Sequence, residues 1–117
     1  MTATDWIEKY KKAWVSNDPD DIRALFTLDG IYKGSPNDAE PARGQDEVAE
    51  WWIGNSESPS DYTFEYWVVI ENDEFAVVQN VTDYAPSGGK TWDNLWVIRW
   101  GADGRAEEFT EWAKARE

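Results

Sequence analysis

Apolar residues recur at helical spacing in three segments of the first half of the chain. Between residues 5 and 16 one side of the predicted helix is charged, and the apolar stripe consists of Trp6, Ile7, Tyr10, Ala13 and Trp14. Asp5 and Glu8 have the spacing of a capping box. A second, short helix is predicted after Asp18, because a proline and two aspartates follow it. The third helix is expected over residues 44–54.

The pattern changes to strands from residue 61 onward. We expect a short strand at 31–33 and longer ones at 62–71, 74–84, 91–100 and 105–112. Helices followed by an antiparallel meander indicate an α+β fold, in which three helices pack on the concave face of a curved antiparallel, partly mixed sheet. A chain of 117 residues is long enough for one core and too short for two, so we expect a single domain over 1–117.

Turn residues between the strands predict which side chains share a face of the sheet. Two-residue turns at Asn72-Asp73 and Gly88-Gly89 would keep paired positions on one face. The predicted covered face then holds Tyr62, Phe64, Tyr66, Val68, Ile70, Phe75, Val77, Gln79, Val81, Trp92, Trp96, Ile98, Trp100, Glu107 and Phe109. It also brings Asp83, Asn94 and Glu111 side by side. A three-residue loop at Gly88 would instead reverse the parity of one half of the sheet.

The candidate chemistry follows from residue types that are missing as well as present. There is no histidine and no cysteine, so the usual ligands of zinc and haem are absent, and we expect neither a metal nor an organic cofactor. Proton transfer would then depend on carboxylates, tyrosines or lysines. Carboxylates grouped in an apolar cup raise the pKa of one of them, so that one proton can be shared. Glu111, Asp83 and Tyr32 are the candidate catalytic residues. The alternatives are a solvated polar rim, or a Glu111 that is held by a lysine.

Aromatic content and charge point to the kind of partner. Nine tryptophans favour an aromatic wall for a small, mainly apolar molecule, and the candidate binding residues are Asn94, Trp96, Tyr10, Phe109, Trp52 and Tyr66. The tyrosines and tryptophans are equally typical of a packed core. A net charge of −13 argues against nucleic acid and anionic membrane. No apolar stretch is long enough for a membrane span and no signal segment is visible, so we expect a cytoplasmic protein.

The opposite sheet face predicts a homodimer. Its apolar residues would form an exposed patch larger than monomers usually tolerate. They are Trp67, Val69, Val78, Leu95, Val97 and Trp112.

Short motifs spread over nearly the whole chain carry a resemblance to a known family. The first half contains Tyr10…Ala13-Trp14…Asp18-Pro19-Asp20, Leu25-Phe26, Asp29-Gly30, Tyr32, Pro36 and Pro41-Ala42-Arg43-Gly44. The second half ends with Asp93-Asn94-Leu95-Trp96…Asp103-Gly104-Arg105…Phe109-Thr110-Glu111-Trp112. This order resembles the SnoaL-like branch of the nuclear transport factor 2-like superfamily. The resemblance implies a cone-shaped α+β barrel, usually a homodimer, with a deep apolar cavity between sheet and helices.

Two enzymes of that superfamily can be compared by position. Tyr32 is similar to the tyrosine of limonene epoxide hydrolase that orients the attacking water, and Glu111 and Asp83 stand where its two aspartates lie. Val81 replaces the arginine between those aspartates, and Gly34 replaces the asparagine that binds the water. Tyr10 is similar to the oxyanion-hole tyrosine of ketosteroid isomerase. In that comparison Trp96 takes the place of the second oxyanion donor, and Ser35 takes the place of the general base.

Three hypotheses on function remain open from the sequence. The first is an enzyme without a cofactor that acts on a small apolar molecule by proton transfer or water activation, as an isomerase, hydrolase or dehydratase. The second is a binding module in which tryptophans hold an apolar ligand while Glu111 and Asn94 satisfy one polar group. The third is a dimeric accessory protein whose vestigial cavity is filled by the tryptophans themselves.

Overall fold

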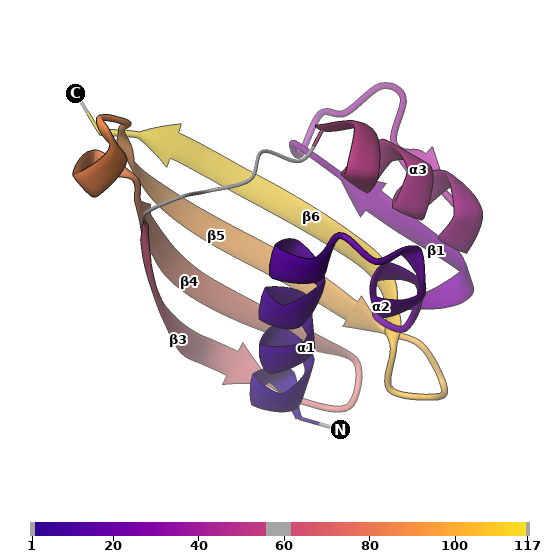
Figure 1. Cartoon of the computed structure of the whole chain (residues 1–117). Coiled ribbons are helices and arrows are strands. Elements are labelled where there is room, and N and C mark those ends of the chain that lie inside the picture. Colours follow the sequence, from indigo (N-terminus) through magenta and orange to yellow (C-terminus); the bar gives the residue numbers. More distant parts are fainter. Residues whose placement is uncertain (1, 56–61, 117) are drawn as a thin grey trace.

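The computed structural model describes residues 2–55 and 62–116 (Figure 1). Its helices are α1 (Ala3–Ser16), α2 (Pro19–Arg23) and α3 (Gln45–Asn55), and a 3₁₀ turn, η1, spans Ala85–Ser87. Its strands are β1 (Phe26–Lys33), β2 (Ala42–Arg43), β3 (Thr63–Glu71), β4 (Phe75–Asp83), β5 (Thr91–Trp100) and β6 (Ala106–Ala115). Among the described residues, no helix has the length and apolar character needed to cross a membrane.

The caps of the first two helices explain where each begins. The Thr2 hydroxyl accepts a hydrogen bond from the Asp5 backbone N–H at 3.1 Å, and the Thr2 backbone N–H donates to Asp5 Oδ2 at 3.1 Å. The capping box is therefore formed by Thr2 and Asp5, and the predicted pairing of Asp5 with Glu8 was wrong. α2 begins as predicted, because Asp18 accepts from the backbone N–H of Asp20 at 2.8 Å.

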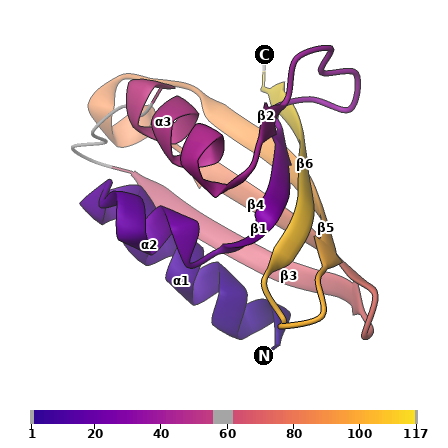
Figure 2. The ribbon, with the colours of Figure 1, turned by 90° about the vertical axis from the view of Figure 1, so that its right-hand side faces the viewer.

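One curved sheet forms the other layer of the molecule. Its six strands have the order β2-β1-β6-β5-β4-β3. β1 runs parallel to β6, while the other neighbouring strands are antiparallel. All three helices lie on one side of the sheet, over its concave face (Figures 1 and 2). The predicted α+β fold, with a mixed sheet and three helices on the concave face, is confirmed.

The core lies between the helices and the concave face. Trp6 of α1 is completely buried, and its ring stacks on Phe109 of β6 with 5.7 Å between ring centroids. Its indole N–H donates to the Leu25 carbonyl oxygen at 2.9 Å, so the buried polar atom is satisfied. Aromatic rings from helices and strands thus meet at the centre of the covered face.

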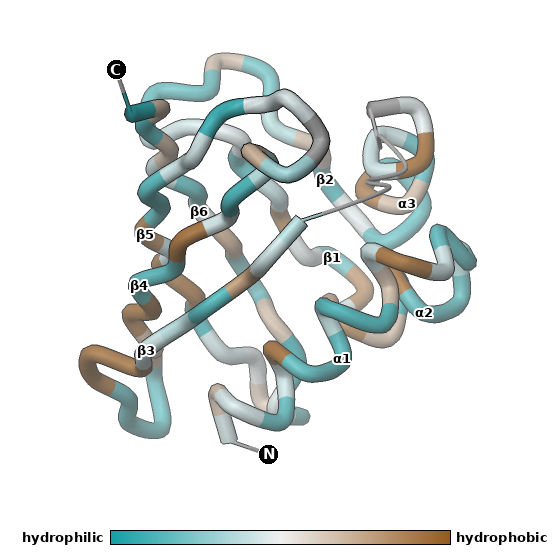
Figure 3. The backbone as a smooth tube through the Cα atoms, turned by 60° about the vertical axis from the view of Figure 1, so that its left-hand side comes forward, coloured by the Kyte–Doolittle hydropathy of each residue, from teal (hydrophilic) through white to brown (hydrophobic). Residues whose placement is uncertain are grey.

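The predicted register of β4 was wrong, and a bulge in β3 is one cause. Between Val68 and Ile70 the pairing of β3 with β4 shifts by one position, so Val69 is the extra residue. Residues 84–90, which include η1, also form a longer connection than the predicted turn at Gly88-Gly89. Figure 3 shows the hydrophobic end of β3 beside the polar turn that leads into β4. The buried residues of β4 are therefore Ala76, Val78, Asn80 and Thr82.

All residues of β4 change faces as a result, so Phe75, Val77, Gln79 and Val81 also leave the predicted covered face. Two of these changes affect the predicted patch and the predicted site. Val78 belongs to the core and is not part of the predicted outer patch. Asp83 alternates with the buried Thr82 and lies on the outer face, where it pairs with Thr91. The predicted faces of β5 and β6 are confirmed for the buried Trp96, Ile98 and Phe109, whereas Glu107 is exposed.

Candidate functional site

A hydrogen bond between β5 and β6 defines the centre of the candidate site. Trp96 and Glu111 are directly paired across the two strands, and Trp96 Nε1 donates to Glu111 Oε2 at 2.9 Å. Only 2% of Trp96 is exposed, whereas Glu111 is partly buried. Glu111 therefore lies on the covered side, at the limit of the aromatic core.

The environment of Glu111 disfavours its charged form. Burial raises the pKa of Glu111, and the hydrogen bond from Trp96 offsets part of that rise. Within the described part of the chain, none of the ion pairs includes Glu111. The alternative in which a lysine holds this carboxylate therefore has no support in the structure.

Two tyrosines from different elements meet behind Glu111. Tyr10 of α1 and Tyr32 of β1 are 8% and 7% exposed, and both rings contact Phe109, at 6.0 Å and 5.0 Å between ring centroids. Burial raises the pKa of both hydroxyls far above the usual tyrosine range, and the Glu111 carboxylate raises both further. Both tyrosines therefore keep their protons at neutral pH and are hydrogen-bond donors.

Aromatic rings fill the space around this polar group. Tyr10 lies 4.5 Å from Trp96 and 5.0 Å from Trp52 between ring centroids. Phe109 lies 5.0 Å from Tyr32 and 5.3 Å from Trp96. The predicted binding residues Tyr10, Trp52, Trp96 and Phe109 are thus brought together. The same packing also makes them part of the core.

Asn80 is a residue of this site that the sequence reasoning missed. It pairs with Asn94 across β4 and β5, and Asn94 Nδ2 donates to Asn80 Oδ1 at 2.9 Å. Asn80 is completely buried. The amide nitrogen of Asn80 and the amide oxygen of Asn94 are buried without a partner among the described residues. The available signal was that Asn80 lies two residues from both Val78 and Thr82 and therefore shares their face of the strand.

Two predicted site residues lie elsewhere. Asp83 accepts hydrogen bonds from the Thr91 hydroxyl at 2.9 Å and from the Ala85 backbone N–H at 2.8 Å, on the outer face. The structure therefore does not bring Asp83 together with Glu111, and Asn80 takes its expected place beside Asn94. Tyr66 lies on the covered face of β3, but its hydroxyl donates to Glu8 of α1 at 3.1 Å, outside the group around Glu111.

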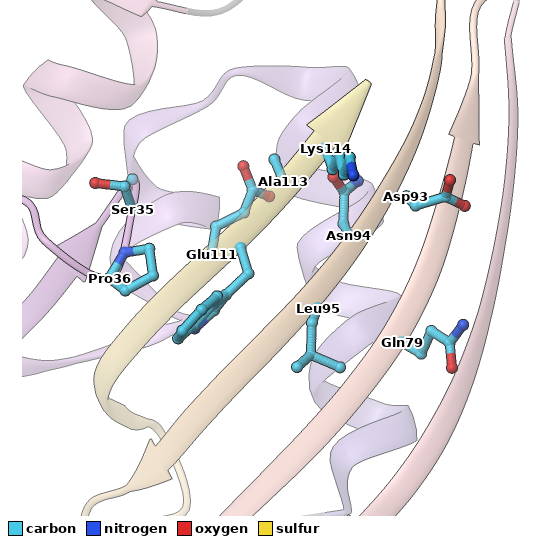
Figure 4. A pocket seen from close by; sticks show the side chains of 11 residues that line it. Ser35, Pro36, Gln79, Asp93, Asn94, Leu95, Glu111, Ala113 and Lys114 are labelled. Carbon is cyan, nitrogen blue, oxygen red and sulfur yellow. The ribbon is translucent and has the colours of Figure 1, made fainter. Parts of the chain in front are cut away.

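A pocket of about 480 Å³ adjoins Glu111. It begins where the pairing of β1 with β6 ends, at Lys33 and Thr110. Figure 4 shows Ser35 and Pro36 on one side of β6 and Leu95 and Gln79 on the other. The pocket is lined by Gly34, Ser35, Pro36, Gln79, Asp93, Asn94, Leu95, Glu111, Trp112, Ala113 and Lys114. It therefore touches the inner residues Asn94 and Glu111 as well as residues of the outer face.

The described residues contain no cluster that could hold a metal ion, counting groups of three or more histidine, cysteine, aspartate or glutamate side chains. The polar groups named around Glu111 are its own carboxylate, the amides of Asn80 and Asn94, the hydroxyls of Tyr10 and Tyr32 and the indole N–H of Trp96. Such a set forms hydrogen bonds and exchanges protons.

The fold and these side chains define a class of protein, an α+β cone with polar groups gathered at one end of an aromatic core. The model of the SnoaL-like domain matches residues 7–109. The chain therefore belongs to the SnoaL-like domain family, as its motifs predicted. No curated protein matches the chain in sequence.

Solved structures share the fold at low sequence identity. A protein from Sphaerobacter thermophilus has a TM-score of 0.75 at 19% identity, with 100% of this chain and 99% of that chain covered. An NTF-2 like protein of unknown function from Burkholderia xenovorans has a TM-score of 0.75 at 12% identity, covering 97% and 84%. A ketosteroid isomerase-like protein from Erwinia carotovora atroseptica has a TM-score of 0.64 at 20% identity, covering 97% and 94%. At these identities the likeness shows the fold alone.

Proposed function

We propose that residues 1–117 form one small-molecule-binding domain, whose ligand is neutral or cationic, mainly apolar, and lies beside Glu111. The observation that carries this proposal is the Glu111 carboxylate, which is partly buried, is bonded to Trp96 and belongs to none of the ion pairs in the described part of the chain. A desolvated carboxylate without a counter-ion costs free energy. Such perturbed groups beside a pocket are typical of binding and catalytic sites.

We further propose that Glu111 exchanges a proton with the bound molecule and that no cofactor takes part. A raised pKa brings a carboxyl group closer to neutral pH, where it can both take up and release a proton. In this proposal the protonated hydroxyls of Tyr10 and Tyr32 donate to an oxygen that becomes negative during such a step. Isomerase, hydrolase and dehydratase reactions all fit this chemistry.

A second candidate function is binding without turnover. The close packing of Tyr10 against Trp96 and Trp52 favours it, because these rings occupy the interior that a deep reaction cavity would need. In this function Glu111 orients a ligand and no bond is broken. An accessory protein with a vestigial cavity is the limiting case, in which no ligand binds.

Three related probes test the proposed ligand class: geraniol, geranylamine and geranic acid, which are neutral, cationic and anionic. Binding is followed by tryptophan fluorescence and by the melting temperature. We expect geraniol and geranylamine to bind and geranic acid to bind more weakly, given the net charge of −13. Glu111→Gln should weaken geranylamine relative to geraniol, whereas the exposed control Glu107→Gln should not. If none of the three changes emission or melting temperature, the accessory reading replaces the proposal.

We also propose that two copies associate through the outer face of the sheet. Trp67, Gln79, Leu95 and Trp112 are directly paired from β3 to β6 and form one row across four strands. Trp67 is 49% exposed and Trp112 is 52% exposed, and the bulge adds Val69 at 59% exposed. Exposed apolar patches of this kind are typical of interfaces between identical chains.

Light scattering at micromolar concentration tests the dimer. Each chain carries a net charge of −13, so repulsion opposes association and added salt should favour the dimer. Trp67→Lys should give a monomer, and Val15→Lys, at an apolar residue on α1 that is 71% exposed, should not. A wild-type monomer of 13.5 kDa at high salt would contradict this proposal.

A further inference from the structure

Two buried atoms of the Asn80–Asn94 pair lack the hydrogen bonds that their chemistry requires. One hydrogen bond of 2.9 Å, from Asn94 Nδ2 to Asn80 Oδ1, joins the two side chains. It leaves Asn80 Nδ2 as a donor and Asn94 Oδ1 as an acceptor without partners among the described residues. Exchanging nitrogen and oxygen in both amides swaps the two roles but still leaves one donor and one acceptor. Asn80 is completely buried, so bulk water does not satisfy its amide. Unpaired polar atoms of this kind are rare in folded proteins.

The pair adjoins the pocket through Asn94. Ala113 of β6 is the direct partner of Asn94, and both residues line the pocket that also touches Glu111. Ala113 is exposed, and it lies on the same face of β6 as Glu111 because the two alternate with Trp112. The pocket therefore reaches Asn94 directly, beside the small side chain of Ala113, while Asn80 is bonded to Asn94 from the buried side.

We propose that the Asn80–Asn94 pair selects ligands whose polar group both donates and accepts a hydrogen bond, namely a hydroxyl or a carboxamide. This inference rests on the proposed function and adds the chemical class of its ligand. Such a group accepts from Asn80 Nδ2 and donates to Asn94 Oδ1, which satisfies both atoms at once. A ketone or an ether only accepts, so it leaves the Asn94 oxygen unpaired. A carboxylate also only accepts, and it adds a second negative charge near Glu111.

Three compounds with the same apolar ring test the preference. Cyclohexanol and cyclohexanecarboxamide donate and accept, whereas cyclohexanone only accepts. Dissociation constants are measured by titrating ¹⁵N-labelled protein and following the indole and side-chain amide signals. We expect the first two compounds to bind about tenfold more tightly than cyclohexanone, the effect of one additional neutral hydrogen bond to a buried group.

Variants separate recognition from a structural role. The double variant Asn80→Leu with Asn94→Leu removes both amides at similar volume, which is nearly neutral for folding. It should still bind cyclohexanone and lose the preference for cyclohexanol. Thr82→Val, which removes another buried polar group from the same face of β4, should keep the preference. Ala113→Leu changes an exposed residue and should block all three compounds.

The outcomes distinguish this inference from the proposed function. Equal affinity of the wild type for all three compounds overturns the inference, because enclosed water then satisfies the pair, and leaves the proposed function standing. A preference that survives in the double variant overturns it as well. Failure of every compound, and of geraniol, to bind the wild type overturns both. The wild-type comparison and Ala113→Leu decide the question even if the double variant does not fold.

Discussion

The hydrogen bond from Trp96 Nε1 to Glu111 Oε2 should contribute a measurable coupling energy to folding. The perturbation is a double-mutant cycle of Trp96→Phe and Glu111→Leu, in which the ring volume lost at Trp96 cancels between the two arms. The N···O distance of 2.9 Å is close to ideal, and Trp96 is 2% exposed. A hydrogen bond to a charged group contributes about 1.5–3 kcal/mol. Because Glu111 is only partly buried, we expect a coupling of about 2 kcal/mol at pH 7.

Urea unfolding followed by far-ultraviolet circular dichroism gives the four free energies of the cycle. Protein concentration is held fixed, because association changes apparent stability. At about pH 4 a large share of the Glu111 carboxyl is protonated, and the coupling should fall toward about 1 kcal/mol, the value of a neutral bond. A coupling below about 0.5 kcal/mol at pH 7, or one that is equal at both pH values, would refute the reasoning.

Three further predictions concern stability and are measured by urea unfolding. At pH values above the raised pKa of Glu111, Glu111→Gln should stabilise the apo protein, because folding of the wild type then buries a charged carboxylate. The gain should fade as the pH drops through that pKa and vanish below the unfolded pKa, and a loss of stability at pH 7 would contradict it. Gly30→Ala should cost about 1–3 kcal/mol, because its Cβ would lie 3.0 Å from the Thr27 carbonyl oxygen; an unchanged midpoint would disprove the clash. Thr2→Ala should cost about 1 kcal/mol by removing the cap of α1, and Thr2→Ser should restore it.

The sequence predicts the helices and the last two strands well, because their signals are local and agree with one another. Asp18 caps α2 as expected, and the apolar stripe of α1 is the buried one. In β5 the large residues Trp92, Trp96 and Ile98 are separated by even numbers of positions, and in β6 Phe109 and Glu111 are separated by two, so each set shares one face of its strand. The prediction that Glu111 and Trp96 share the covered face needed only this spacing and the pairing of the two strands.

The sequence pattern could not predict the register of β4, and the reason is physical. Val68, Val69 and Ile70 are all β-branched and apolar, so the pattern cannot show which one is the extra residue of the bulge. Gln79 and Asn80 are adjacent and both carry a side-chain amide, so polarity does not show which of the two faces the helices. The roles of Asp83 and Asn80 depended on that one choice.

The bulge at Val69 also bears on how copies of this chain can assemble. β3 is an edge strand, and an unbroken edge would offer its backbone to another strand. Strand addition leads to fibres when each added chain offers a further edge to the next one. The extra residue interrupts the regular hydrogen-bonding pattern of the strand and increases its local twist. A second strand could therefore not pair regularly along the whole length of β3. The bulge thereby disfavours open-ended addition of strands along the edge of this sheet.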